Sequence, residues 1–237
     1  MILNIVKYEH LKNSDQAIIP IQPHSWIVNS FVADRSAIFS TLANQWVLFI
    51  DSDVELNPKK LEQIQSELPR LSQSHVYCGM YENPAGASIQ QQAHNALSNF
   101  WLQQGHNQPQ PTRLLGGFFM LFLDPQKISK LPKIPLFWGG EDVFLGYELQ
   151  KVGFQLILKP EWKLAHHTSN SFKHFIKRAW LHGWNHRRHP RVNSSDLRLQ
   201  LTDWIRFLKT QQILCGILIM FHFMLFFCAK IIRNIFP

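Results

Sequence analysis

The sequence is poor in charge and in cysteine, and each shortage excludes a class of protein. Charged residues make up only 17% of the 237 residues, whereas 46% are hydrophobic. Intrinsic disorder requires the opposite balance, so we expect a folded chain. The three cysteines, Cys78, Cys215 and Cys228, form no C-x-x-C pair and leave an odd thiol, which argues against a disulfide framework and against a zinc knuckle. We therefore expect a reducing cytosolic setting.

We also expect no secretory signal, and acidic residues are scarce in the last third of the chain. Residues 1–10 (MILNIVKYEH) contain no basic stretch followed by an apolar core. Residues 151–237 carry 14 basic and 3 acidic side chains, whereas residues 1–150 carry 10 and 13. A basic region of this kind could face nucleic acid, anionic lipid or a phosphorylated substrate. Nucleic acid is disfavoured because the basic region runs directly into an apolar tail.

The apolar tail predicts membrane association of residues 201–237. Residues 213–229 (ILCGILIMFHFMLFFCA) contain only one strongly polar side chain, and 17 residues is about the shortest length that spans a membrane. A buried core helix is the alternative reading. A spanning helix and an amphipathic helix in the interface both remain open. The second keeps all the flanking cations beside anionic headgroups, namely Arg206, Lys209, Lys230 and Arg233.

The pattern before residue 200 predicts an α/β fold in a single domain, because short apolar runs alternate with helical periods. Residues 46–50 (WVLFI) form a continuous apolar run of the kind that is buried on both faces of a parallel sheet. We expect further strands at 75–81, 118–123 and 154–158, the last ended by Lys159-Pro160. We expect helices beginning near Pro58, Ser88, Glu141 and Ser171.

Two carboxylates follow the strand at residues 46–50. Asp51 and Asp53 stand one residue apart, at the end of a strand where open α/β sheets place their ligands. Such a pair can share a divalent ion, and Mg²⁺ prefers a sparse oxygen site completed by water and substrate phosphates. An ordinary acidic turn is the alternative reading of this D-x-D motif.

A second acidic pair, Glu141-Asp142, follows Trp138 and Gly140. Carboxylates at a helix start are favoured by the helix dipole and by free N–H groups, so a simple helix cap would explain them. The alternative is a general base in a glycine-flanked opening where a substrate can approach the backbone.

Two further motifs have both a structural and a functional reading. Gly116 and Gly117 precede a strand, where paired glycines usually make a turn or bulge but also let a ligand come close. His166 and His167 follow the strand at 154–158 and its turn. Loop histidines are ordinarily solvated, but histidine is also a common metal ligand.

In this order and spacing, the four motifs resemble the family-2 glycosyltransferases of the GT-A fold, over residues 26–190. Residues 46–58 (WVLFIDSDVELNP) look like the family's strand ending in a metal-binding D-x-D, and residues 139–160 (GGEDVFLGYELQKVGFQLILKP) look like its E-D block. The resemblance implies a GT-A-like, mostly parallel sheet flanked by helices. It also implies that Asp51 and Asp53 hold Mg²⁺ or Mn²⁺ on the diphosphate of a nucleotide-sugar donor.

The resemblance also implies roles for the other motifs. Asp142 maps onto the catalytic base, with Glu141 supporting it, and either His166 or His167 is implied as a further metal ligand. Residues 33–36 (ADRS) resemble the A-R-N segment that helps bind the nucleotide, which assigns Asp34 and Arg35 to the donor. The positions on the acceptor side are Gly116, Gly117, Trp138 and Gly140.

The expected activity is a metal-dependent, inverting transfer of one sugar to a hydroxyl of a saccharide or lipid-linked acceptor. We expect it on the cytoplasmic face of the cell membrane, in the synthesis of a surface polysaccharide or glycolipid. Processive synthases of the family carry a Q-x-x-R-W motif, whereas here Ala179 separates Arg178 from Trp180. The departure favours a single-transfer enzyme over a polymerase.

Two alternatives follow from departures from the family pattern. Only 50 residues precede Asp51, and residues 1–22 show no clear nucleotide-binding βαβ unit. That unit is therefore either abbreviated or completed by a partner chain, and a non-catalytic membrane-bound partner of a glycosyltransferase is one alternative. A haloacid-dehalogenase-like phosphatase is the other. It is disfavoured because Glu55 stands where that family has Thr or Val, and because its D-x-D lies near the chain start.

Overall fold

The structure is a computed structural model, and it describes residues 3–8, 27–30, 42–51, 53–107, 113–114, 117–132, 141–185 and 201–235. Within these ranges the strands are β1 (Leu3–Tyr8), β2 (Ile27–Ser30), β3 (Trp46–Asp51), β4 (His75–Glu82), β5 (Phe118–Phe122) and β6 (Gln155–Ala165). The helices are α2 (Pro58–Glu67), the 3₁₀ turn η1 (Leu68–Arg70), α3 (Ile89–His106), α4 (Pro125–Ile128), α5 (Glu141–Lys151), α6 (Phe172–Asn185), α7 (Leu201–Lys209) and α8 (Ile213–Ile235).

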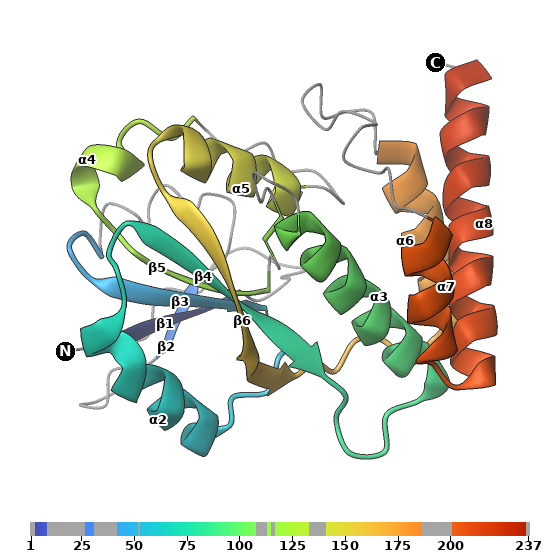
Figure 1. The fold of residues 1–237 in the computed structure, drawn as a ribbon, viewed down its shortest axis with the longest axis horizontal. Coiled ribbons are helices and arrows are strands. Elements are labelled where there is room, and N and C mark those ends of the chain that lie inside the picture. Colours follow the sequence, from blue (N-terminus) through green and yellow to red (C-terminus); the bar gives the residue numbers. More distant parts are fainter. Residues whose placement is uncertain are drawn as a thin grey trace.

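The six described strands form one sheet in the order β2-β1-β3-β5-β4-β6. β1 pairs in parallel with β2 and β3, β4 pairs in parallel with β6, and β5 is antiparallel to both β3 and β4. All described strands except β5 therefore point the same way. Figure 1 shows α2 on one side of this sheet and α4 with α5 on the other. The predicted α/β fold, a mostly parallel sheet flanked by helices and followed by an apolar C-terminal helix, is confirmed.

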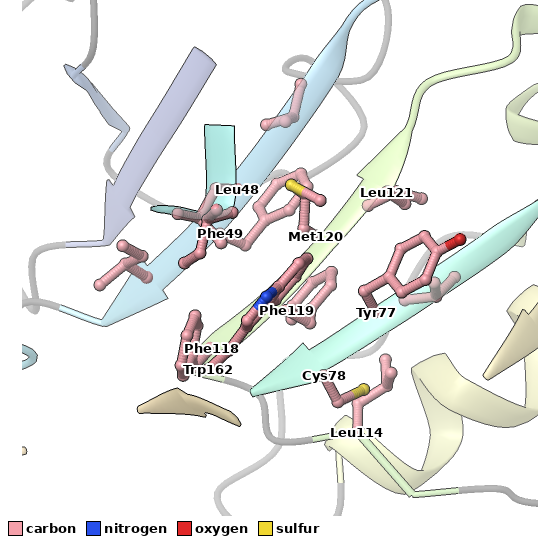
Figure 2. Packing of buried hydrophobic residues seen from close by; sticks show 14 of the residues in the cluster. Leu48, Phe49, Tyr77, Cys78, Leu114, Phe118, Phe119, Met120, Leu121 and Trp162 are labelled. Carbon is pink, nitrogen blue, oxygen red and sulfur yellow. The ribbon is translucent and has the colours of Figure 1, made fainter. Parts of the chain in front are cut away.

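The centre of the sheet is the hydrophobic core. Trp46 to Ile50 are all buried, as the uninterrupted apolar run predicts for a strand covered on both faces. The rings of Phe49 and Phe119 stack across β3 and β5 with their centroids 4.8 Å apart (Figure 2). This rigid apolar centre holds the ends of β3, β4 and β5 in fixed relative positions.

Local signals set the helix starts as the sequence predicts. The Asn57 side chain accepts a hydrogen bond from the backbone N–H of Lys60 and caps α2. Ser88 and Gln91 form a reciprocal capping box at the start of α3. α3 then packs against β4 and β6, which places its buried polar residues next to the ends of those strands.

The strand predicted at residues 154–158 is longer than expected. β6 continues past Pro160 to Ala165. Cys78 of β4 pairs with Leu158 and Met80 pairs with Lys163, so the register shifts between these two pairs and the pairing resumes after the irregularity. Proline has no backbone N–H to donate, and it is tolerated at a bulge where ladder hydrogen bonds are interrupted. Since β6 continues, it ends beside the carboxyl end of β3.

One described strand, β1, lies within residues 1–22, where the sequence shows no clear nucleotide-binding unit, and β2 follows at Ile27–Ser30. β1 pairs with β3 so that Tyr8 stands opposite Asp51. Within β1, Leu3 and Ile5 are buried although Asn4 and Lys7 interrupt the apolar run, and that mixed pattern concealed the strand. The sheet thus extends beyond β3 on its N-terminal side, and β1 ends at the same edge as Asp51.

α8 does not stand alone but packs against α6 and α3 (Figure 1). A second apolar cluster joins these helices to α7, with Ala93, Leu97, Phe175, Cys215, Ile219 and Phe223 as its buried members. A stretch of α8, Ile213–Arg233, is long and apolar enough to cross a membrane. The division of the chain at residue 200 stays a prediction.

Candidate active site

The polar residues of the site lie where several strands end. β1, β3, β4 and β6 point the same way, so their carboxyl ends share one edge of the sheet. Asp51 ends β3, Tyr81 lies one residue before the end of β4, and His166 follows β6. Open α/β sheets bind their ligands at this edge, and the D-x-D motif therefore lies where the sequence predicts it.

Gly117 makes room for the first carboxylate of the D-x-D motif. A Cβ atom at this position would overlap both the carboxylate of Asp51 and the hydroxyl of Tyr81. The backbone N–H of Asp51 also donates to the Gly117 carbonyl, 3.2 Å away. Glycine is therefore required here by the close approach of two polar groups. The sequence assigned Gly117 to the acceptor side, and the structure places it against Asp51.

The second carboxylate lies beside a buried histidine. The Oδ1 atom of Asp53 is 3.3 Å from Nε2 of His166, whose side chain is only 2% exposed. Val54 and His166 form an antiparallel bridge, and the His167 N–H donates to the Asp53 carbonyl at 2.7 Å. The turn after β3 is thus fastened to the turn after β6, although more than one hundred residues separate them.

Asn95 of α3 fixes the orientation of His166. The amide group of Asn95 donates to the backbone carbonyls of His166 and Glu82, at 3.2 and 3.4 Å, so its oxygen must be the atom that faces the ring. That oxygen lies 2.7 Å from Nδ1 of His166 and accepts its proton. Nε2 of the same ring faces Asp53, where it either carries a proton that it donates to the carboxylate or, without that proton, presents a lone pair that a metal ion can take. Two acceptors that face each other at 3.3 Å need a proton or a metal ion between or beside them.

The buried Tyr81 lies within electrostatic range of three carboxylates. Burial raises the pKa of this phenol well above its ordinary value, and the negative charges of Asp51, Asp53 and Asp142 raise it further. Its ring also stacks on that of His166, with centroids 4.0 Å apart. The start of α5 therefore lies within electrostatic range of the D-x-D motif. The hydroxyl of Tyr81 stays protonated and can donate a hydrogen bond to an anion.

Arg178 of α6 supplies a positive charge to the same region. Burial opposes ionisation of Asp53, but the hydrogen bond and charge of His166 and the charge of Arg178 outweigh it and lower the carboxyl pKa. Arg178 also lies 3.3 Å from the hydroxyl of Thr168. Behind it, burial and the Arg178 charge keep the pKa of His94 well below its ordinary value, so this histidine is neutral.

The remaining predicted residues are distributed as follows. His167 turns away from Asp53 and lies 2.8 Å from Glu55, with both side chains about half exposed. The backbone of Glu141 begins α5. The other predicted donor and acceptor positions lie outside the described residues, namely Asp34, Arg35, Gly116, Trp138 and Gly140.

Within the described part of the chain, no three His, Cys, Asp or Glu side chains converge as a ready-made metal cage. Asp53 with His166, and Asp51 beside Gly117, offer the donor types that a divalent ion takes. Mg²⁺ and Mn²⁺ commonly complete such sparse sets with water and substrate phosphate. The residues present thus fit an ion that is bound together with a phosphorylated ligand.

Sequence reasoning missed Tyr81 and Asn95. Tyr81 reads as one more apolar residue of a buried strand, and Asn95 as one polar residue of a helix. Neither position carries a local signal, because their roles arise only where α3 crosses the ends of β4 and β6.

No protein-family model matches the sequence, and a comparison with curated proteins finds no match. Among solved structures, the chain is similar to the mannosyltransferase PcManGT from Pyrobaculum calidifontis in complex with GDP-Man and Mn²⁺. The TM-score is 0.46 at 9% identity, over 90% of this chain and 68% of that one. It is also similar to a mycobacterial protein, with a TM-score of 0.42 at 11% identity, over 76% and 72% of the two chains. Both TM-scores lie below 0.5, so the function has to be argued from the residues of the site.

Proposed function

We propose that the protein is a metal-dependent, inverting glycosyltransferase. It moves one sugar from a nucleotide-sugar donor to a hydroxyl of a saccharide or lipid-linked acceptor. The observation that carries the proposal is the placement of the D-x-D carboxylates around Tyr81. Asp51 and the Tyr81 hydroxyl meet at Gly117, and Asp53 lies beside the histidine, His166, that stacks on the Tyr81 ring. Asp142, about ninety residues further along the chain, is near enough for its charge to act on the same phenol. A site with two carboxylates for the leaving diphosphate and a third for the acceptor is what such a transfer requires.

Asp51, Asp53 and His166 are the residues that would hold Mg²⁺ or Mn²⁺. When bound, the ion supplies a Lewis acid that neutralises the negative charge of the leaving diphosphate. Asn95 accepts the Nδ1 proton of His166 and so keeps Nε2 directed at Asp53, as the hydrogen-bond partner of a metal-bound histidine commonly does. Arg178 and the Tyr81 hydroxyl add a charge and a hydrogen-bond donor for phosphate oxygens.

Asp142 is the proposed general base. It stands in the first turn of α5, near enough for its charge to act on Tyr81 beside the D-x-D motif. Its carboxylate would take the proton of the acceptor hydroxyl while that oxygen attacks the anomeric carbon. The bond to the diphosphate breaks on the opposite face, so a single displacement inverts the configuration. Glu141 would support the site without taking the proton.

We place the reaction at the cytoplasmic face of the cell membrane, in the synthesis of a surface polysaccharide or glycolipid. The apolar helix α8 and the basic residues around it support a membrane setting, because anionic headgroups attract such segments.

The test is a donor screen with UDP-, GDP- and dTDP-sugars in the presence of Mn²⁺, followed by two substitutions. Asp53→Asn should abolish metal-dependent donor binding in calorimetry. Asp142→Asn should leave donor binding near wild type and lower turnover by about two to four orders of magnitude, the usual contribution of acid–base catalysis. Glu55→Gln is the matched control, since Glu55 is an exposed carboxylate that pairs with His167, outside the proposed chemistry.

Three results would count against the proposal. Wild-type protein that transfers no sugar from any donor would favour a non-catalytic partner. Unchanged Mn²⁺-dependent donor binding in Asp53→Asn would remove the metal assignment. More than about a tenth of the wild-type rate in Asp142→Asn, which is well inside the range of acid–base catalysis, would mean that another group is the base.

A further inference from the structure

The outer face of α8 is apolar and exposed along the whole helix. We call this set the α8 outer stripe: Ile213, Leu214, Ile217, Met220, Met224, Phe227, Ile231, Ile232 and Ile235, each between 39% and 82% exposed. A helix of 23 residues is about 34 Å long, at about 1.5 Å per residue. A contiguous apolar surface of that length is unusual on a soluble monomer and marks a site of contact with a partner or a membrane.

The inner face of α8 is already occupied by protein. Cys215, Ile219 and His222 are buried, and the backbone of α8 at Phe226 comes so close to α6 that Gly183 has no room for a Cβ atom. Near the end of the helix, Arg233 donates to the carbonyl of Trp184, the penultimate residue of α6. α8 is therefore held against the folded domain from its first turns to its last ones.

Two of the helices that pack beside α8, namely α6 and α7, carry charged side chains. Lys173 and Lys177 are exposed on α6, and Lys209 and Arg206 are exposed on α7, with 82% of the Arg206 side chain in solvent. If α8 crossed a bilayer, these neighbours would follow it into the hydrocarbon, where each charge costs several kcal/mol. The packing thus separates two orientations that composition leaves open, and it favours the interface.

We propose that α8 lies in the plane of an anionic bilayer surface, with the outer stripe in the headgroup–acyl boundary and the cations of α6 and α7 among the headgroups. An apolar face flanked by lysine and arginine is the signature of a helix that binds a membrane in this way. About half of the helix circumference faces lipid, and the other half faces the domain.

This orientation brings the candidate active site to the membrane surface. Phe172, the first residue of α6, is 45% exposed and stacks on Phe221 of α8, so it extends the apolar surface toward the site. Further along α6, Arg178 contacts the hydroxyl of Thr168, and its positive charge lowers the pKa of the Asp53 carboxyl. Resting on the proposed function, this geometry selects an acceptor whose lipid tail stays in the bilayer while its hydroxyl reaches the carboxylates.

The orientation can be measured with depth-sensitive probes. Cys78 and Cys215 are buried and Cys228 is exposed, so Cys228→Ser leaves a chain without a reactive surface thiol. Into this background we would introduce Ile213→Cys, Met224→Cys or Ile235→Cys, attach an environment-sensitive fluorophore, and add vesicles of phosphatidylcholine and phosphatidylglycerol that contain quencher lipids.

The proposal expects the same shallow depth for all three probes, about 5–10 Å into the headgroup–acyl boundary. A central probe near the bilayer midplane, about 15 Å deep, with the two end probes in opposite leaflets, would show a spanning helix and overturn the proposal. Absence of vesicle binding by the intact chain, with either charged or neutral lipid, would overturn it as well.

A charge in the stripe should weaken binding in the same vesicles. Met224→Glu replaces an exposed side chain, so the fold should survive, as circular dichroism can verify. Full burial of a methionine side chain contributes about 1.5–3 kcal/mol, so vesicle affinity should fall about tenfold or more. Gln63→Glu adds the same charge to an exposed position on α2 and should leave affinity unchanged apart from a small loss due to net charge. Equal affinities for the two variants would contradict the proposal.

These measurements are independent of the proposed catalysis, because vesicle binding needs neither donor nor metal. Mn²⁺-dependent donor binding by Met224→Glu should equal that of the wild type. If the wild type binds vesicles as expected but binds no nucleotide sugar, the proposed function fails and the docking surface stands. If the wild type binds donor but the three probes report a spanning helix, the proposed docking surface fails and the proposed function stands.

Discussion

The contact between α6 and α8 can be tested by adding a single methyl group. In Gly183→Ala, the new Cβ atom would overlap the carbonyl oxygen and carbon of Phe226. Backbone atoms cannot rotate away as a side chain can, so the two helices must move apart. Overpacking of this kind typically costs about 1–3 kcal/mol.

A matched substitution isolates that cost. Gly216 lies in α8, and a Cβ atom there would meet nothing within 4 Å. Both substitutions replace glycine by alanine in a helix, which by itself stabilises by up to about 1 kcal/mol. Since the propensity gain is similar in the two variants, the difference between them, about 1–3 kcal/mol, reports the clash alone.

Cysteine labelling provides the assay. In a Cys228→Ser background, a thiol reagent reaches Cys215, on the inner face of α8, only when the helix detaches, whereas Cys78 in the sheet reports global unfolding. A difference of 1–3 kcal/mol corresponds to labelling of Cys215 that is about 5- to 150-fold faster in Gly183→Ala than in Gly216→Ala. Equal labelling rates in the two variants would refute the close contact between the helices.

Three further predictions concern stability and the site. Burial lowers the pKa of His182 from 6.5 to about 3, and burial also lowers the pKa of His94. The unfolded chain therefore binds protons that the folded chain does not, so the free energy of unfolding should decrease as the pH falls from about 6.5 to about 3. Denaturant titrations at several pH values measure this decrease. Gly117→Ala should displace the Asp51 carboxylate and weaken Mn²⁺-dependent donor binding while the far-ultraviolet dichroism stays native, and undiminished binding would contradict that geometry. Asn95→Leu removes several buried hydrogen bonds, so it should destabilise the fold by about 1–3 kcal/mol and weaken metal affinity by about 10- to 100-fold, measured by calorimetry with Mn²⁺ and donor.

Sequence alone was sufficient to predict those features that depend on residues within one short segment. The apolar run at residues 46–50 has no polar side chain to turn toward solvent, so it forms the strand β3, whose five apolar residues are all buried. Asn57 and Ser88 cap helices with their own side chains, which makes the helix starts predictable. The D-x-D motif was located for the same reason, because a strand end and the residues that follow it are adjacent in the chain.

Prediction from the sequence was less successful where the extent of a strand depends on pairing with a strand that is distant in the chain. β6 continues through Pro160 because β4 can pair on both sides of the bulge, and a rule based on proline alone ends the strand too early. β1 forms a strand because it pairs with the buried strand β3, although Asn4 and Lys7 interrupt its apolar pattern. Pairing partners distant in sequence override local preference in both cases.

The chemistry of the site divides in the same way. The sequence by itself determined which residues can act as acids, bases and ligands, since Asp51, Asp53 and Asp142 have that chemistry wherever they lie. Only the tertiary structure decided that all three act on the buried Tyr81, and that the α8 stripe faces outward while α3 and α6 cover the opposite side. The physical reason is that electrostatic coupling and burial depend on distances in space. Those distances are set by sheet order and helix packing, between residues that the chain itself keeps far apart.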